Sequence, residues 1–178
     1  MLERRGDLWI LAHELNADAV CITTNGAVRS NGSAILGLGC ALEAATKYPW
    51  FPEALGISLK MHGLRVQAFK NLQYNMSYTL VSFPVKPAYV IANNMSTNIV
   101  SHKRWNYGTG VKAPGWAAVA DLDLLKRSSH ELMELIGLNQ WQCVVMVRPG
   151  VGAGELTWDE VKTVIEPILD NRVVVVRR

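Results

Sequence analysis

The chain alternates between short runs of apolar, β-forming residues and longer segments that carry an apolar stripe at helical spacing. The apolar runs predict strands at residues 6–13, 18–24, 64–69, 77–85, 141–147 and 173–176. The longer segments predict helices at residues 52–61, 121–137 and 158–169, and a further helix that is entered through the glycines of residues 35–39 and ends before Pro49. Strands that alternate with helices favour a layered α/β domain with a mostly parallel sheet.

Residues 86–119 lack a regular pattern and contain two prolines and several aromatic residues, among them Tyr89, Trp105 and Tyr107. A structureless loop of this length is uncommon in a compact domain unless it is functional. Its stretch HKRWNY, residues 102–107, mixes cations with aromatic rings. Two interpretations stay open: a lid or base-stacking surface beside a ligand, or a solvated loop packed by its own tryptophan. Lys86, which follows a Phe-Pro corner, is a candidate to face a ligand cleft.

Two glycine-rich loops follow predicted strands, at residues 32–40 and 150–154. Ligands of parallel sheets bind beyond the carboxyl ends of the strands, where both loops are expected to lie. Glycines let the main chain approach a ligand closely, and a helix that opens after the loop adds N–H groups and partial positive charge. A diphosphate clamped between the loops is therefore expected, although each loop taken alone is equally typical of a plain turn. The sequence contains no GxxxxGK[ST], and the second loop does not complete GxGxxG because residue 155 is glutamate.

Composition narrows the class of protein. The 178 residues are 49% hydrophobic and 19% charged, which predicts a single globular domain over residues 1–178. A net charge of +3 is too small to argue for nucleic acid. No signal-peptide core and no apolar run near the roughly 18 residues of a membrane span is visible, so we expect a cytoplasmic protein. The three cysteines form no CxxC pair, and we expect buried thiols, no metal site and no cofactor.

Several motifs, in order along nearly the whole chain, resemble the macrodomain family of ADP-ribose-binding modules, and most closely small macrodomain-like proteins of phages and bacteria. They are GDLW at 6–9, DAVCITTNG at 18–26, NGSAILGLGCA at 31–41, the Phe-Pro-x-Lys of residues 83–86, PGW with ADLDLL between 114 and 125, and RPGVGAGELTW at 148–158. The resemblance implies a three-layer α/β/α fold with a central, mostly parallel mixed sheet.

The resemblance also assigns ligand contacts. Asp7 would accept a hydrogen bond from the adenine amino group, with the backbone N–H of Leu8 toward the ring, and Asn25 would contact the distal ribose. The alternative for Asp7 and for Asn25 is a residue that merely forms a turn. The two diphosphate loops would contribute mainly backbone N–H groups, from Gly37, Gly39 and Cys40 in the first and from Gly150, Val151, Gly152, Ala153 and Gly154 in the second.

The resemblance implies a hydrolase that removes a phosphate or a protein carboxylate from the distal ribose of ADP-ribose. Asn25, which would orient the ribose, and Glu155 are the candidate catalytic residues. One hydrolytic branch of the family uses an aspartate where this chain has Gly154, so a non-catalytic binder that sequesters an ADP-ribose-type ligand, for example in phage–host defence, is the alternative. A structural protein that binds no nucleotide is a third interpretation. The expected partners are ADP-ribose or a derivative and ADP-ribosylated protein, with no nucleic acid or membrane, for a monomer in the cytoplasm, or in the host cytoplasm if a phage encodes it.

Overall fold

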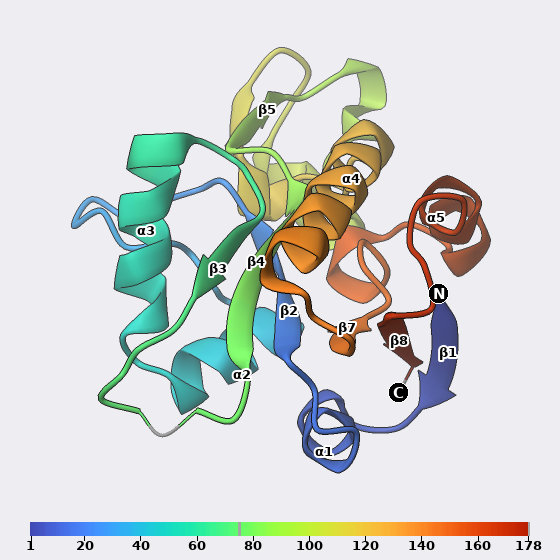
Figure 1. Cartoon of the computed structure of the whole chain (residues 1–178). Helices are drawn as coiled ribbons and strands as arrows, with labels where there is room; N and C mark the ends of the chain where they lie inside the picture. Colours follow the sequence, from blue (N-terminus) through green and yellow to red (C-terminus); the bar gives the residue numbers. More distant parts are fainter. Residues whose placement is uncertain (75, 178) are drawn as a thin grey trace.

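A six-stranded sheet forms the centre of the computed structural model, which describes residues 1–74 and 76–177 (Figure 1). The strand order is β1-β8-β7-β2-β4-β3, and β3 is antiparallel to its neighbour while the other pairings are parallel. The strands are β1 (Leu2–Arg5), β2 (Ala19–Asn25), β3 (Gln67–Phe69), β4 (Thr79–Lys86), β7 (Val144–Val147) and β8 (Val173–Arg177). The predicted α/β class with a mostly parallel mixed sheet is confirmed.

Helices cover both faces of this sheet. The helices are α1 (Leu8–Glu14), α2 (Gly39–Lys47) and α3 (Phe51–His62) on one face, and α4 (Leu122–Asn139) and α5 (Trp158–Ile165) on the other. The alternation of side chains along a strand divides the core accordingly. Val20 and Ile22 of β2 belong to the first cluster, whereas Ala19 and Cys21 belong to the second. The predicted three-layer α/β/α arrangement is therefore confirmed.

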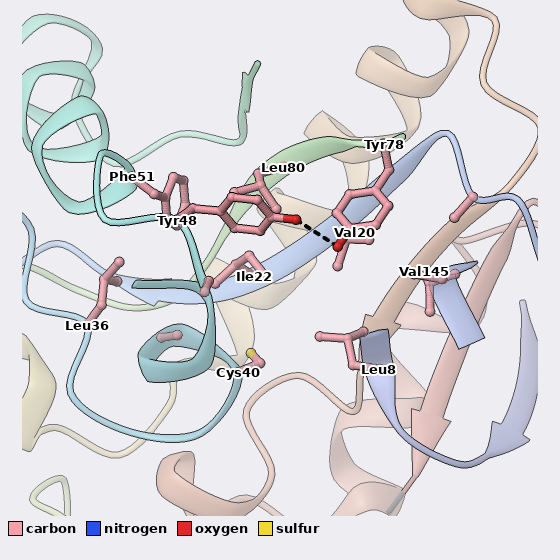
Figure 2. Close-up of a cluster of buried hydrophobic side chains, with 14 of the residues drawn as sticks. Leu8, Val20, Ile22, Leu36, Cys40, Tyr48, Phe51, Tyr78, Leu80 and Val145 are labelled. Carbon is pink, nitrogen blue, oxygen red and sulfur yellow. Dashed lines mark hydrogen bonds between the residues drawn. The ribbon is translucent and has the colours of Figure 1, made fainter. Parts of the chain in front are cut away.

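The first core cluster fixes the corner between α2 and α3 (Figure 2). The hydroxyl groups of Tyr48 and Tyr78 lie 2.9 Å apart and share a hydrogen bond in the buried layer. Phe51, which is fully buried, packs edge-on against Phe69 at 5.3 Å between ring centroids. Pairing the two phenols removes the cost of burying their polar ends. This packing anchors the C-terminal end of α2. The first turn of the same helix borders a cavity at the carboxyl ends of the parallel strands.

The prediction of a strand at residues 6–13 is wrong, because this segment begins helix α1. The Asp7 carboxylate accepts hydrogen bonds from the N–H groups of Trp9 and Ile10, which makes it the N-cap of that helix. Leu8 and Ala12, four residues apart, form the buried side. The strand lies instead in the preceding residues 2–5, whose side chains are exposed at the edge of the sheet, so no apolar pattern marks it.

Residues 87–119 form a separate small structure between β4 and α4, which we call the cap segment. Its strands β5 (Tyr89–Ile91) and β6 (Lys112–Pro114) pair antiparallel and lie at the top of Figure 1. Three short 3-10 turns complete it: η1 (Asn94–Ser96), η2 (Ser101–Asn106) and η3 (Gly115–Ala117). Buried Ala92, Ile99 and Ala113 give it a core of its own. The segment is thus ordered by local packing rather than by long secondary structure.

Candidate ligand-binding site

Two adjoining cavities of about 360 and 350 Å³ lie beyond the carboxyl ends of the parallel strands. They share Thr23, Leu38, Val151 and Ala153, so they form one continuous cleft. The first is also lined by Thr24, Asn25, Ile35, Gly37, Ala41, Val85, Lys86, His102, Lys103, Trp116, Gly150 and Gly154, and the second by Gly39, Cys40, Val147, Arg148, Gly152, Val176 and Arg177. Both predicted glycine loops therefore meet in this cleft.

The first loop leads into an uncapped helix. Leu38, in extended conformation, is the N-cap of α2, and its side chain makes no capping hydrogen bond. Gly39 has a φ of +56°, and a Cβ at Gly37 or Gly39 would meet no atom within 4 Å. The first turn of a helix presents unpaired N–H groups and a partial positive charge. Since Gly39 and Cys40 line the second cavity, that charge borders the cleft.

The second loop does not lead into an open helix, contrary to our expectation. Residues 152–154 form a 3-10 turn, and α5 begins only at Trp158. Thr157 and Glu160 close its N-terminus with a capping box in which each side chain bonds the backbone of the other. Residues of α5 border neither cavity. The open helix start belongs to α2, while the second loop contributes only its own backbone.

Gly154 is required by packing. A Cβ at this position would lie 2.8 Å from the Cβ of Ala120, and the Gly154 carbonyl accepts a hydrogen bond from the Ala120 N–H. Such a contact is closer than real side chains allow, so an aspartate at residue 154 would require Ala120 to move. The absence of a carboxylate at this position therefore follows from how tightly the second loop packs against the segment that precedes α4.

Asn25 lies at the end of β2 and lines the first cavity. Its side-chain oxygen accepts from the N–H of Ala27, and its Nδ2 donates to the Ile35 carbonyl. These bonds fold the chain that carries the first loop back over β2. An amide nitrogen has two N–H groups and the Ile35 bond uses one of them, so turn formation and ligand contact are compatible for this side chain.

Lys86 is a buried cation on the cleft wall, with only 7% of its surface exposed. Its Nζ donates to the backbone carbonyls of Ala153, at 2.6 Å, and Trp116, at 3.3 Å. Burial lowers the pKa of this ammonium to about 8, although the Glu155 carboxylate acts in the opposite direction. Lys86 thus joins the second loop to the cap segment and places an ionisable group in the cleft.

Glu155 does not line either cavity, and it does not cap α5. Its carboxylate accepts hydrogen bonds of 2.7–2.9 Å from the N–H and hydroxyl of Ser101, and lies 4.0 Å from the His102 Nδ1. Burial raises the pKa of Glu155, but the Ser101 hydrogen bonds and the nearby Arg104 and His102 side chains outweigh this and hold it below its ordinary value. In this geometry Glu155 fastens the cap segment to the second loop.

The stretch 102–107 is divided between the cleft and solvent. His102 and Lys103 line the first cavity, and the Lys103 Nζ lies 5.8 Å from the centre of the Trp116 ring. Trp105 is 94% exposed, so it does not pack the loop. The arrangement favours a cleft wall over a loop packed by its own tryptophan. Trp116 belongs to the PGW motif of the family resemblance, but the sequence predicted no ligand contact for it.

Asp7 and Leu8 border neither cavity. Leu8 is fully buried in the first core cluster, and one Asp7 oxygen caps α1. The preceding Gly6 donates its N–H to the carbonyl of Arg177, which does line the second cavity. The start of α1 therefore lies beside the end of β8, next to this half of the cleft.

Sequence patterns also missed Arg148, which lines the second cavity. Its guanidinium lies 4.5 Å from the centre of the Trp158 ring and donates to Glu3 at 2.9 Å. Glu3 lies 145 residues away in the sequence, so only the fold reveals this contact. Within residues 1–74 and 76–177 no three potential metal-ligating side chains are grouped together. In the same part of the chain, every helix is too short or too polar to cross a bilayer.

No protein-family model matches the sequence, and no curated protein matches it either. Solved structures are similar over nearly the whole chain. The macrodomain of Mycobacterium tuberculosis DarG is 17% identical, with a TM-score of 0.68, over 99% of this chain and 97% of that one. The macrodomain of Thermus aquaticus DarG gives 18% identity and a TM-score of 0.68, over the same shares of the two chains.

The chain has the macrodomain fold.

A third similar structure with this macrodomain fold is Thermosipho africanus DarTG in complex with ADP-ribose, at 12% identity and a TM-score of 0.67. The similarity covers 96% of this chain but 39% of the DarTG chain. At these identities the likeness establishes the fold. The cleft of this protein itself indicates which ligand it binds.

Proposed function

We propose that this protein binds ADP-ribose or a close derivative in the cleft between the two glycine loops. The observation that carries the proposal is the meeting of the open α2 N-terminus with the second loop in one continuous cleft. Backbone N–H groups at such a position favour an anion such as a diphosphate. The two cavities extend to either side, which suits a ligand with a nucleoside on one side of its diphosphate and a ribose on the other.

The similar DarTG structure in complex with ADP-ribose supports the same ligand, since it shares the fold. The start of α1 beside the second cavity is consistent with adenine there, because the Asp7 carboxylate is an acceptor and adenine carries an amino donor. Asn25 and Lys86 on the first cavity are then the groups nearest the distal ribose.

We further propose hydrolysis of a group on the distal ribose as the activity of this site. Lys86 supports it, because a lysine whose pKa lies at about 8 is partly neutral near physiological pH and is able to exchange a proton with a ligand. Asn25 would orient the ribose, so that catalysis rests on positioning and electrostatics. Glu155 would act through Ser101 as a positioning residue.

The second candidate is a binder without activity that sequesters an ADP-ribose-type ligand. It is favoured by Gly154, because Ala120 leaves no room there for the aspartate that one hydrolytic branch of the family uses. The cleft then serves recognition alone, and Lys86 contributes charge rather than proton transfer.

Calorimetry with ADP-ribose tests binding, and incubation with ADP-ribose 1″-phosphate and with glutamate-ADP-ribosylated protein tests turnover. Binding together with release of either group supports the hydrolase. Tight binding without any turnover overturns the hydrolase and supports the sequestering protein. A ligand at 100 times its dissociation constant adds about 2.7 kcal/mol to stability. An unchanged melting temperature at millimolar ADP-ribose therefore overturns both and favours a structural role.

A further inference from the structure

Among the described residues, the wall of the first cavity around Trp116 carries the basic side chains of Lys86, His102 and Lys103 and no carboxylate. Lys86 donates to the Trp116 carbonyl, and the Lys103 Nζ lies over the Trp116 ring. His102 lines the same cavity directly before Lys103. Neither the residues that line this cavity nor those that line the adjoining one include an aspartate or a glutamate. This wall therefore presents N–H donors and positive charge with no carboxylate among its lining residues, although the Glu155 carboxylate lies 4.0 Å from the His102 Nδ1 behind it.

Of these three side chains, Lys86 has the largest free-energy cost of burying its charge. It is buried, and within the described part of the chain its ammonium donates to two neutral carbonyls and to no carboxylate. Burial of a charge without an ion-pair partner is unfavourable unless an opposite charge compensates for it. Glu155 acts on Lys86 only through space, because its oxygens accept from Ser101. An anionic ligand group in the cavity would supply the missing charge.

The sequence around the cleft also contains basic residues without acidic ones. Residues 54–120 contain seven lysines and arginines and neither aspartate nor glutamate, although the whole chain has 15 acidic residues. The cap segment and the strand that carries Lys86 both belong to this stretch. Few local carboxylates are thus available to compete with an anion for these cations.

We propose that Lys86, His102 and Lys103 form a second anion-binding subsite, apart from the two glycine loops, that takes a phosphate carried on the distal ribose. This inference rests on the proposed binding of ADP-ribose. The proposed substrates carry either a phosphate or a protein carboxyl group on the distal ribose, and the subsite selects the phosphate. A phosphomonoester carries about −1.5 to −2 charges at neutral pH, whereas an ester-linked carboxyl group is neutral. The diphosphate stays with the backbone N–H groups of the loops, and the side-chain donors hold the additional phosphate.

The test compares the affinities for ADP-ribose and ADP-ribose 1″-phosphate by rapid competition against a fluorescent ADP-ribose analogue, before turnover depletes the phosphorylated ligand. Wild type is expected to bind the phosphorylated ligand about tenfold more tightly or better, and the preference should shrink at high salt. The combined His102→Ala and Lys103→Ala variant should lose the preference, because its affinity for ADP-ribose 1″-phosphate falls much more than its affinity for ADP-ribose. Both side chains lie on a surface turn, so their removal spares the core.

Lys112→Ala is the matched control. Lys112 belongs to the same acid-free stretch, but its Nζ lies 3.9 Å from the centre of the Tyr89 ring and it borders neither cavity. It should keep the full preference. Equal affinities of wild type for the two ligands overturn the subsite and leave ADP-ribose binding intact. An equal loss of preference in Lys112→Ala also overturns it, since general surface charge then explains the effect. Binding of neither ligand overturns the proposed function itself.

Discussion

Asn25 of β2 pairs with Lys86 of β4 at the point where both strands reach the cleft. The register shifts there by one residue, because Thr24 pairs with Pro84 and leaves Val85 as an extra residue in β4. A one-residue slip turns a side chain to the other face of a sheet. The bulge therefore brings the Lys86 cation to the same side as the Asn25 amide, and the two groups proposed to meet the distal ribose depend on it.

Replacement of Asn25 by alanine removes two hydrogen bonds that fold the first loop back, to Ala27 and Ile35. We expect the free energy of unfolding to fall by about 1–3 kcal/mol and the affinity for ADP-ribose to fall with it. Denaturant unfolding and calorimetry measure the two effects. Asn31→Ala is the control, because Asn31 accepts two hydrogen bonds from Ser33 outside the cleft. If Asn31→Ala lowers affinity equally, the effect belongs to the loop as a whole and not to Asn25.

Asp7→Asn separates helix capping from adenine recognition. Asparagine caps helices as well as aspartate does, so stability should stay within about 0.5 kcal/mol of wild type. A carboxylate offers about four acceptor sites, enough for the cap and an adenine amino group, whereas the asparagine side chain adds an NH₂ donor. The variant should therefore bind ADP-ribose more weakly than wild type does. Its affinity for the 6-oxo analogue, which carries hypoxanthine in place of adenine, should fall less or should rise. Asp121→Asn, at the cap of α4, should change neither affinity. Unchanged base preference in Asp7→Asn would leave Asp7 with a capping role alone.

Gly152→Val should block the second diphosphate loop. Gly152 has a φ of +68° and lines the second cavity with open space around its Cα. Valine there introduces backbone strain of about 1–2 kcal/mol and fills the space that a ligand would occupy. Gly110→Val carries the same strain at a φ of +81° in the cap segment, away from both cavities. Comparable losses of stability are expected in the two variants, with loss of ADP-ribose affinity only in Gly152→Val. Full affinity in Gly152→Val would show that the ligand lies elsewhere.

Lys86→Met should reveal the cost of the buried ammonium through its pH dependence. The pKa of Lys86 falls from the ordinary 10.5 to about 8 in the folded protein, so between these values the unfolded chain binds more protons than the folded one. The contribution of Lys86 to stability therefore rises as pH increases from about 8 to 10.5, by on the order of 3 kcal/mol in total. Denaturant unfolding of both proteins between pH 7 and about 10 should show that the free energy of unfolding of wild type rises relative to that of Lys86→Met. A pH-independent difference between them would mean that Lys86 is not desolvated.

Glu155→Ala should weaken the connection between the cap segment and the second loop, because Ser101 loses its hydrogen bonds to the carboxylate while the Lys86 contacts remain. Hydrogen exchange at the Ser101 amide is expected to become faster, with a smaller effect on the central strands. Glu160→Ala is the matched control, since Glu160 accepts comparable hydrogen bonds from Thr157 at the start of α5. It should destabilise α5 and leave Ser101 exchange unchanged. Equal exchange at Ser101 in wild type and Glu155→Ala would remove the fastening role of Glu155.

The hydrophobic pattern alone predicted most of this fold. The buried strand β2 and the helices α2, α3 and α4 were located to within a few residues, because each has an apolar face at a regular spacing. The predictions failed where that signal is weak or ambiguous. The exposed edge strand of residues 2–5 has no apolar face, and the short apolar run that follows it fits a strand as well as the helix that forms there.

The sequence by itself determined that two glycine-rich loops follow parallel strands and meet at one edge of a sheet, because chain order and strand direction decide this. Only the tertiary structure decided which loop leads into an open helix, why Gly154 tolerates no side chain, and that Lys86, His102 and Lys103 gather around Trp116. These features depend on contacts between segments far apart in the chain, such as Ala120 with Gly154 and Ser101 with Glu155. Local residue patterns do not encode such distances, because they arise only when the layers pack together.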